Sequence, residues 1–132
     1  MIVVDTAALA AIVFNEPERN SFIKTILLAD KALVCTATAL EARMVVLGRK
    51  GQAGVLLLND FFGLPMFELV APNALELEAA YAAFVTFGKG SGHPAQLNFG
   101  DLFSYAVAKL CNLPLLYKGG DFACTDLQSA VT

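Results

Sequence analysis

Short apolar segments alternate along this chain with longer segments that have the apolar spacing of helices. The first short segment is Ile2-Val3-Val4, a β-branched run that ends at Asp5. A run this short and this uniformly apolar is typical of a strand that is buried on both faces of a sheet. Strands that alternate with helices build right-handed βαβ units. The sequence therefore predicts an α/β fold in which helices cover both faces of a parallel sheet.

The same reading places the individual elements. The expected strands are Ile2–Val4, Ala32–Cys35, Met66–Val70 and Pro114–Tyr117. The expected helices are Thr6–Ala11, Pro17–Leu28, Thr38–Leu47, Gln52–Phe62, Asn73–Phe87 and Asn98–Leu110. In the third helix Thr38 would be the N-cap residue, with Glu41 three residues later and Gly48 following the end. We expect a loop at Gly88–Pro94, a turn at Phe122–Asp126 and a short edge strand in the last residues.

The length of 132 residues is typical of one domain, so we expect residues 1–132 to form a single domain. Hydrophobic residues make up 57% of the chain, which raises the question of a membrane segment. The longest apolar run, Ile2–Phe14, contains Asp5 and is shorter than the about 20 residues that a spanning helix needs. No Lys or Arg precedes this run, as one would in a signal peptide, so a soluble, cytoplasmic protein is expected.

Cysteine content and net charge limit the functional classes. Cys35, Cys111 and Cys124 have no CxxC spacing, so they support neither a disulfide framework nor a zinc site. We expect them to be small buried side chains in a reducing compartment. The net charge of −3 gives no basic surface for general nucleic-acid binding, so a polyanionic substrate would need bound cations.

Three acidic residues, Asp5, Glu41 and Asp101, are not easily explained by a solvated surface, and Asp121 is a fourth candidate because of its place after a strand. Asp5 ends an apolar strand and Asp121 follows the last one, while Glu41 and Asp101 have apolar neighbours. Each also has a purely structural interpretation, as a helix-capping residue, a member of a capping box with Thr38, or a turn residue. In parallel sheets, however, ligands bind beyond the carboxyl ends of the strands. Carboxylates gathered there repel one another unless a cation or protons neutralise them.

Such a cluster predicts a hard divalent metal ion. Mg²⁺ or Mn²⁺ suits a site made of oxygen ligands and leaves coordination positions open for substrate oxygens. A phosphodiester is the expected substrate. The metal would activate a water molecule, stabilise charge on the transferring phosphoryl group and assist the leaving oxygen.

Other chemistries have weaker support. His93 is the only histidine, and no serine has the nucleophile-elbow pattern, so a Ser-His-Asp hydrolase is not expected. We interpret His93 as a hydrogen-bonding residue of its loop. The GxxxxGK[ST] and GxGxxG patterns of phosphate and dinucleotide sites are absent. A metal-dependent phosphatase with Asp5 as nucleophile would need a second aspartate two residues later, where Ala7 stands.

Four segments together resemble PIN-domain ribonucleases of the VapC toxin type. They are Val-Val-Asp-Thr-Ala-Ala-Leu (3–9), Leu-Glu-Ala (40–42), Gly-His-Pro-Ala-Gln-Leu-Asn-Phe-Gly-Asp (92–101) and Leu-Tyr-Lys-Gly-Gly-Asp-Phe-Ala-Cys-Thr-Asp (116–126). The resemblance covers essentially the whole chain. It implies a three-layer α/β/α PIN-like domain with a central, mainly parallel sheet. It also implies a Mg²⁺- or Mn²⁺-dependent endoribonuclease activity on RNA, and neutralisation by the cognate antitoxin of a type II toxin–antitoxin system.

Roles for individual residues follow from the resemblance. Asp5, Glu41 and Asp101 would be the metal-binding and catalytic carboxylates, with Thr6 assisting beside Asp5.

At the fourth acidic position the chain departs from the family pattern. Gly120 stands where family members commonly have an acidic or polar residue, so Asp121 is the candidate for the fourth metal-binding and catalytic carboxylate, and Asp126 is the reserve. A single-metal site is one consequence of this loss. Gly120 and the net charge of −3 also support an alternative function, that of a catalytically weak or inactive PIN-like module that binds RNA or protein.

Basic and apolar residues suggest contacts with partners. Lys118 and Arg43 are the candidates for contact with RNA phosphates, while Lys89 is interpreted as a surface charge. The apolar stretch Val55–Phe62, with Leu64 and Met66, would form a dimer or antitoxin groove, unless these side chains pack in the core. A homodimer is expected, because a small chain with surplus apolar surface usually forms one.

Overall fold

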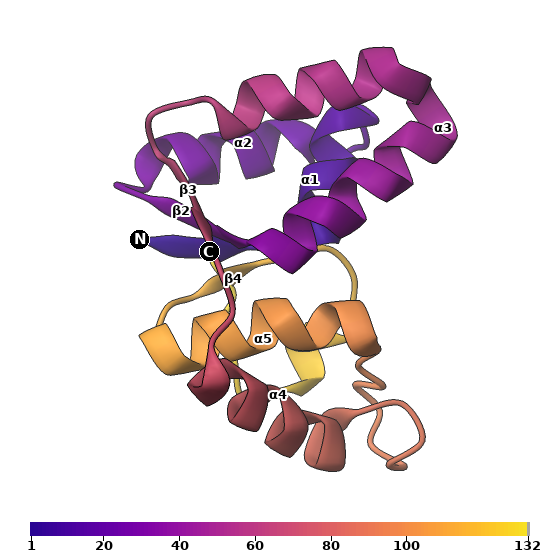
Figure 1. The fold of residues 1–132 in the computed structure, drawn as a ribbon, viewed down its shortest axis with the longest axis vertical. Coiled ribbons are helices and arrows are strands. Elements are labelled where there is room, and N and C mark those ends of the chain that lie inside the picture. The colour runs from indigo at the N-terminus through magenta and orange to yellow at the C-terminus, as the bar shows by residue number, and fades with distance from the viewer. Residues whose placement is uncertain (132) are drawn as a thin grey trace.

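A sheet of four strands separates two layers of helices in the computed structural model, which describes residues 1–131 (Figure 1). The strands are β1 (Ile2–Val4), β2 (Ala32–Cys35), β3 (Phe67–Val70) and β4 (Leu115–Leu116). They lie in the order β3-β2-β1-β4, and every neighbouring pair is parallel. The predicted α/β/α fold with a parallel central sheet is therefore confirmed.

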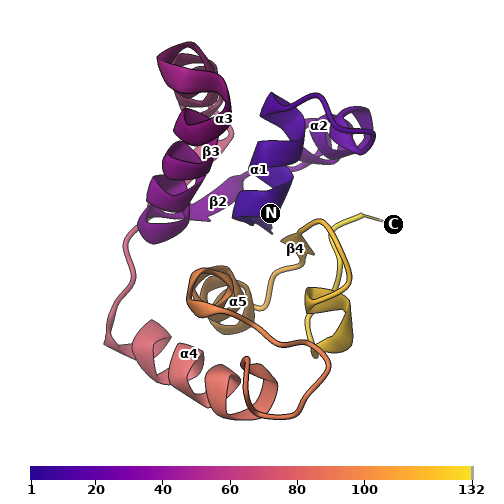
Figure 2. The same cartoon turned by 90° about the vertical axis from the view of Figure 1, so that its right-hand side faces the viewer.

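Helices cover both faces of this sheet (Figure 2). One layer contains α1 (Thr6–Val13), α2 (Arg19–Leu28) and α3 (Thr36–Phe62), and the other contains α4 (Ala74–Phe87) and α5 (Phe99–Cys111). Along β1, Ile2 and Val4 pack into the core beneath the first layer, whereas Val3 packs into the core beneath the second. Successive strand side chains point to opposite faces, so the uniformly apolar run reflects burial on both sides.

The strand order reverses at β1. β2 pairs with one side of β1 and β4 pairs with the other, although they are the second and the last strands of the chain. In parallel α/β sheets, ligands bind at such a reversal, outside the carboxyl ends of the strands. Asp5 is the first residue beyond the carboxyl end of β1. The fold therefore places this carboxylate where a ligand is expected.

The structure corrects the predicted boundary in the third helical segment. α3 continues through Gly48, and its non-helical residue is Gly51, with φ 63° and ψ −163°, where the helix kinks (Figure 1). Thr38 is not the N-cap residue; Cys35 occupies that position, and the Thr38 hydroxyl is buried against Ser104. A glycine ends a helix only where its backbone leaves the helical region, and the sequence does not distinguish Gly48 from Gly51 in this respect.

The remaining elements differ from the prediction by a few residues at their ends. Asn73 caps α4 as expected, because its side chain accepts a hydrogen bond from the Glu76 amide at 3.1 Å. The predicted turn contains a short 3₁₀ helix, η1 (Phe122–Cys124). Instead of a complete edge strand, the last described residues make one parallel bridge, between Ser129 and Leu115.

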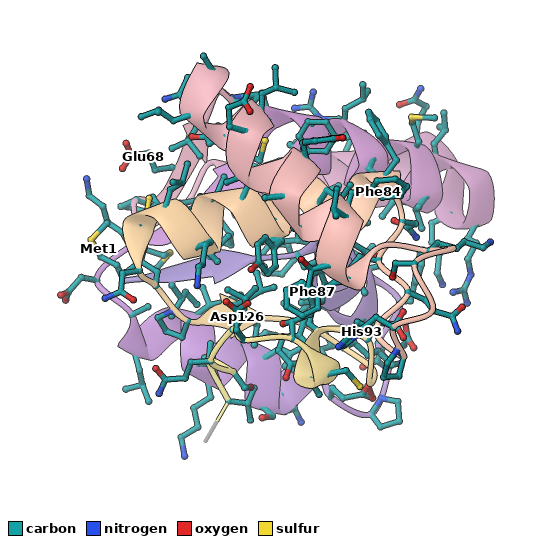
Figure 3. The ribbon with its side chains drawn as sticks, turned by 90° about the horizontal axis from the view of Figure 1, so that it is seen from below. Met1, Glu68, Phe84, Phe87, His93 and Asp126 are labelled. Atoms are coloured by element: carbon teal, nitrogen blue, oxygen red, sulfur yellow. The ribbon has the colours of Figure 1, made fainter. Side chains whose placement is uncertain are left out.

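The expectation of buried cysteines is met only in part, whereas the expectation for the single histidine is confirmed. Cys35 is buried as expected, but Cys111 and Cys124 are exposed, because they lie at the end of α5 and in η1 rather than in a strand. The interpretation of His93 as a loop residue is confirmed. Its Nδ1 accepts a hydrogen bond from the Ala95 amide at 3.1 Å, and its ring meets the Phe87 ring edge-on at 4.9 Å between centroids (Figure 3).

The stretch Val55–Phe62 is divided between core and surface. Leu58 is fully buried, whereas Leu56, Leu57 and Leu64 are exposed. No helix within residues 1–131 combines the length and apolarity that crossing a membrane requires.

Candidate active site

The four predicted acidic residues come from four different parts of the chain. Asp5 follows β1 and caps α1, and Glu41 lies in the second turn of α3. Asp101 is in the first turn of α5, and Asp121 follows β4 and precedes η1. Electrostatic coupling links Asp5 to Asp101, and Asp101 to both Glu41 and Asp121. The structure thus brings all four acidic groups into one neighbourhood.

Asp5 is the most buried of these residues, with 3% of its surface exposed. Ser104 on α5 donates its hydroxyl proton to Asp5 Oδ1 at 2.6 Å, and the Ala7 amide donates to Oδ2 at 3.4 Å. The Ala7 contact makes Asp5 an N-cap, so its structural interpretation holds together with the functional one. Burial, supported by the nearby Asp101 charge, raises the pKa of Asp5 to about 6, although the Ser104 hydrogen bond opposes this rise.

The Glu41 carboxylate lies between α1 and α5. Thr6, the first residue of α1, donates its hydroxyl proton to Glu41 Oε1 at 2.5 Å. This contact replaces the capping box with Thr38 that the sequence suggested, while the assisting role of Thr6 beside Asp5 stays a prediction. On its other side the carboxylate lies against the backbone of Gly100, in the first turn of α5.

Asp101 has two structural partners and two acidic neighbours. It forms a capping box with Asn98, in which each side chain accepts a hydrogen bond from the other residue's amide, at 2.9 and 3.0 Å. Burial raises the pKa of Asp101, and the charges of Asp121 and Glu41 raise it further, against the effect of the Asn98 amide. The cap therefore orients a carboxylate that remains half-buried among like charges.

Asp121 and Asp126, the two candidates for the fourth site carboxylate, have different surroundings in the structure. Asp121 is exposed and contributes to the electrostatic field at Asp101. Asp126, in contrast, accepts hydrogen bonds from the Tyr105 hydroxyl at 2.7 Å and from Lys109 at 2.6 Å. These contacts, which lower the pKa of Asp126, engage its carboxylate in fastening the C-terminal segment to α5.

The two predicted phosphate-binding cations are engaged elsewhere. Lys118 forms ion pairs with Glu16 and with Glu18, the latter at 3.1 Å. Arg43 is exposed, and its Nε donates a hydrogen bond to Asn59 Oδ1 at 3.1 Å, across the bend of α3. Their contact with RNA phosphates stays a prediction.

Among residues 1–131, none of the four acidic groups forms an ion pair with a lysine or arginine. In the same part of the chain, no three ligating side chains converge closely enough to hold a metal ion as they stand. Thr6 and the capping box hold Glu41 and Asp101 in their present directions. The donor set nevertheless fits a hard divalent ion, because it consists of carboxylate and hydroxyl oxygens whose mutual repulsion a cation relieves.

One residue that contacts a site carboxylate, Ser104, was not predicted from the sequence. Ser104 is fully buried and bonds to Asp5, and its Oγ also lies 3.3 Å from Thr38 Oγ1. One signal was available for Ser104. It follows Asp101 by three residues in a helix, and residues at that spacing share a face.

A family model for the PIN domain matches residues 2–126 of this chain. The chain is 40% identical over 128 residues to Ribonuclease VapC30 of Mycobacterium tuberculosis, and this match covers 97% of each protein. The likeness therefore extends over nearly the full length of both.

Solved structures share the fold at much lower sequence identity. The crystal structure of VapC20 of Mycobacterium tuberculosis, described as a sarcin-ricin loop cleaving toxin, has a TM-score of 0.79 at 15% identity and covers 96% of each chain. A toxin-antitoxin complex from Klebsiella pneumoniae has a TM-score of 0.68 at 17% identity, over 93% of this chain and 91% of that one. At these identities the comparison supports the α/β/α arrangement.

Proposed function

The chain belongs to the PIN-domain family and, within it, to the VapC ribonucleases, and we propose that Asp5, Glu41, Asp101 and Asp121 form its catalytic, metal-binding site. The substrate is RNA, and the reaction is hydrolysis of a phosphodiester bond within the strand. The observation that carries this proposal is the gathering of four acidic groups at the sheet reversal with no cation from residues 1–131 paired to them.

A divalent ion of the Mg²⁺ or Mn²⁺ class supplies Lewis-acid activation of water and neutralises charge on the phosphoryl group. Asp5 and Asp101 would hold this ion, because they are the two site acids whose pKa burial raises and whose charges would therefore gain most from a cation. Glu41 and Asp121 would complete the coordination shell of this ion or orient its other ligands. Asp121 is exposed and lies at the solvent side, where substrate enters.

Hydroxyl groups determine which carboxylate oxygens are free to act. Ser104 occupies Asp5 Oδ1 at 2.6 Å, while Oδ2 has only the 3.4 Å contact with the Ala7 amide, so Oδ2 is the oxygen offered to the ion. Thr6 likewise occupies Glu41 Oε1, while Oε2 lies against the backbone of Gly100. The chain thus orients its ligands through two hydroxyls before the metal or the substrate arrives.

Lys118 is the better placed of the two predicted phosphate contacts. It lies between β4 and Asp121, where a substrate phosphate would compete with Glu16 and Glu18 for its ammonium group. Arg43 is exposed on α3, two residues beyond Glu41, and remains a second candidate.

The decisive experiment is cleavage of a mixed pool of structured RNAs by the purified protein with Mg²⁺, with Mn²⁺ and with EDTA. Asp5→Asn and Asp101→Asn are expected to reduce metal-dependent cleavage at least a hundredfold while the protein stays folded. Asp60→Asn, which changes an exposed acid of α3, is the matched control and keeps full activity. Cleavage that survives EDTA or both site variants would overturn the proposal.

Two other functions predict different results in the same experiment. A catalytically inactive module of this fold would bind RNA equally with and without Asp5→Asn, and would cut it in neither form. A phosphatase would hydrolyse small phosphomonoesters and leave RNA intact.

The proposed cellular role is that of the toxin of a type II toxin–antitoxin pair in the cytoplasm, neutralised by its cognate antitoxin. The 40% identity to a VapC ribonuclease and the similarity to a chain of a solved toxin-antitoxin complex support this role. Co-expression with the antitoxin is expected to restore growth of a host in which the chain alone arrests it.

The proposed oligomer is a homodimer formed through an apolar groove of about 540 Å³ between α4 and α5. Phe99 and Tyr81, which line this groove, have 78% and 65% of their surfaces exposed. The same surface therefore contains both protruding side chains and a groove that could accept them from a second copy. A two-fold interface requires this kind of self-complementary surface. Glu76 Oε2, buried at the groove without a hydrogen-bond partner among residues 1–131, would receive a donor from the second copy.

A further inference from the structure

We propose that Gly100 is a positioning residue, whose missing side chain leaves the space in which the Glu41 carboxylate lies. The inference rests on the proposed role of Glu41 in metal binding and adds the feature of α5 that fixes its position.

The geometry at Gly100 leaves no room for a side chain. A Cβ built on its backbone would lie 2.1 Å from Glu41 Oε2, 2.7 Å from Cδ and 2.8 Å from Oε1. These distances are far below the about 3.5–4.0 Å at which non-bonded carbon atoms rest. All three nearest atoms belong to the Glu41 carboxyl group, so this single group occupies the volume that a methyl group would fill.

The backbone itself gives no reason for a glycine at this position. Gly100 lies within α5, and it is not among the glycines with positive φ, which are Gly51, Gly90, Gly92 and Gly119. Within a helix, alanine is favoured over glycine by about 1 kcal/mol. An alanine would therefore suit the helix better, and the advantage of glycine lies in its contact with Glu41.

Thr6 holds the carboxylate from the opposite side. Its hydroxyl donates to Glu41 Oε1 at 2.5 Å, while Oε2 is the atom nearest to the built Cβ of Gly100. The carboxylate of α3 is thus confined between the first turns of α1 and α5. Since Asp5 caps α1 and Asp101 lies next to Gly100, this confinement sets the distance of the Glu41 carboxylate from those of Asp5 and Asp101.

Substitution of Gly100 by alanine should move the Glu41 carboxylate without unfolding the protein. The obstructing atoms are the end of a flexible side chain, which can rotate away from Thr6 into solvent. The helix gains a better residue while the Thr6 hydrogen bond to Glu41 is lost, and because these two effects oppose each other only a small change in melting temperature is expected. The proposed metal site, however, would lose the Glu41 carboxylate from its place between α1 and α5.

The test compares Mn²⁺ affinity, by calorimetry on metal-free protein, for the wild type, Gly100→Ala, Glu41→Ala and the double variant. Gly100→Ala is expected to weaken Mn²⁺ binding at least tenfold, and to weaken it no further when Glu41 is already alanine. Gly48→Ala is the matched control, because Gly48 is also helical and its Cβ would meet nothing within 4 Å. Equal losses from Gly100→Ala in the presence and absence of Glu41 would overturn the proposal.

A crystal structure of metal-free Gly100→Ala provides a second readout that does not depend on the metal. We expect the Glu41 carboxylate to have left Thr6, and a carboxylate that stays on Thr6 would refute the positioning role. Wild-type protein that binds no Mn²⁺, together with a displaced Glu41 in this crystal, would instead contradict the proposed function and leave the role of Gly100 standing.

Discussion

At the scale of single residues, the Asp5 carboxyl lies in surroundings that disfavour its charge. Its folded pKa of about 6 lies above the ordinary value of 3.8, so the folded chain binds more protons than the unfolded chain between these values. Stability from this group is therefore greatest below pH 3.8 and is lost as pH rises through 6. The loss at neutral pH is on the order of 3 kcal/mol.

Asp5→Asn is accordingly expected to raise the melting temperature of the metal-free protein at pH 7.5 by several degrees. The difference between variant and wild type should shrink as the pH falls through this window and largely vanish below pH 3.8, where Asp5 becomes protonated in the unfolded state as well. Thermal unfolding followed by circular dichroism across this pH range, in EDTA, measures both effects. A variant that is less stable than the wild type at pH 7.5 would show that burial does not disfavour this charge.

Ser104 offers a second prediction at this scale. Ser104→Ala removes the hydroxyl that donates to Asp5 Oδ1 at 2.6 Å, in a site with no exposed surface. A hydrogen bond to a charged group contributes about 1.5–3 kcal/mol, more than one to a neutral group. Urea unfolding should therefore show a larger loss of stability at pH 7.5 than at pH 4. Thr38→Val, which removes the next hydroxyl along, is the control and should show less pH dependence.

The predictive value of the sequence also differs from residue to residue. Asp5 and Asp101 were correctly interpreted as helix-capping residues, and the same two side chains lie among the site acids, so the structural and functional interpretations do not exclude each other. Ser104 was missed because its partner Asp5 lies 99 residues away. Such a contact exists only after β1 and α5 have packed, and no local pattern records it.

At the scale of elements, the short apolar strands were the most predictable part of the fold. β2 was predicted to the residue, because its four residues are all buried and its boundaries coincide with polar neighbours. The error in α3 arose because a glycine signals a break only through its backbone conformation, which neighbouring packing determines. Gly48 accepted the helical conformation, and Gly51 three residues later did not.

This difference between the two glycines predicts opposite effects of alanine. At Gly51, where φ is 63° and ψ is −163°, alanine should cost about 1–3 kcal/mol of unfolding free energy. At Gly48 it should stabilise α3 by up to about 1 kcal/mol. A built Cβ meets nothing within 4 Å at either position, so the backbone alone explains the contrast. Chemical denaturation of the two variants checks it, and equal effects would contradict this account of the kink.

At the scale of the whole molecule, the apolar groove between α4 and α5 predicts the oligomeric state. Phe99→Glu places a charge in the centre of the proposed interface and should convert the dimer to a monomer in sedimentation experiments. Leu28→Glu is the control, since Leu28 is as exposed as Phe99, at 76%, but lies on α2 in the other helical layer. A protein that is already monomeric as wild type would remove the groove from consideration as a dimer interface.

The pairing of β1 with β4 has a consequence for how such a protein is made. Asp121 is translated 116 residues after Asp5, although both belong to the proposed site, and β1 lacks its second neighbour until β4 has been synthesised. At about 5–20 residues per second, the ribosome completes the intervening segment only after several seconds. A nascent chain that has not yet reached β4 therefore lacks both the second neighbour of β1 and the proposed carboxylate Asp121, so the proposed site is incomplete until that segment has been made.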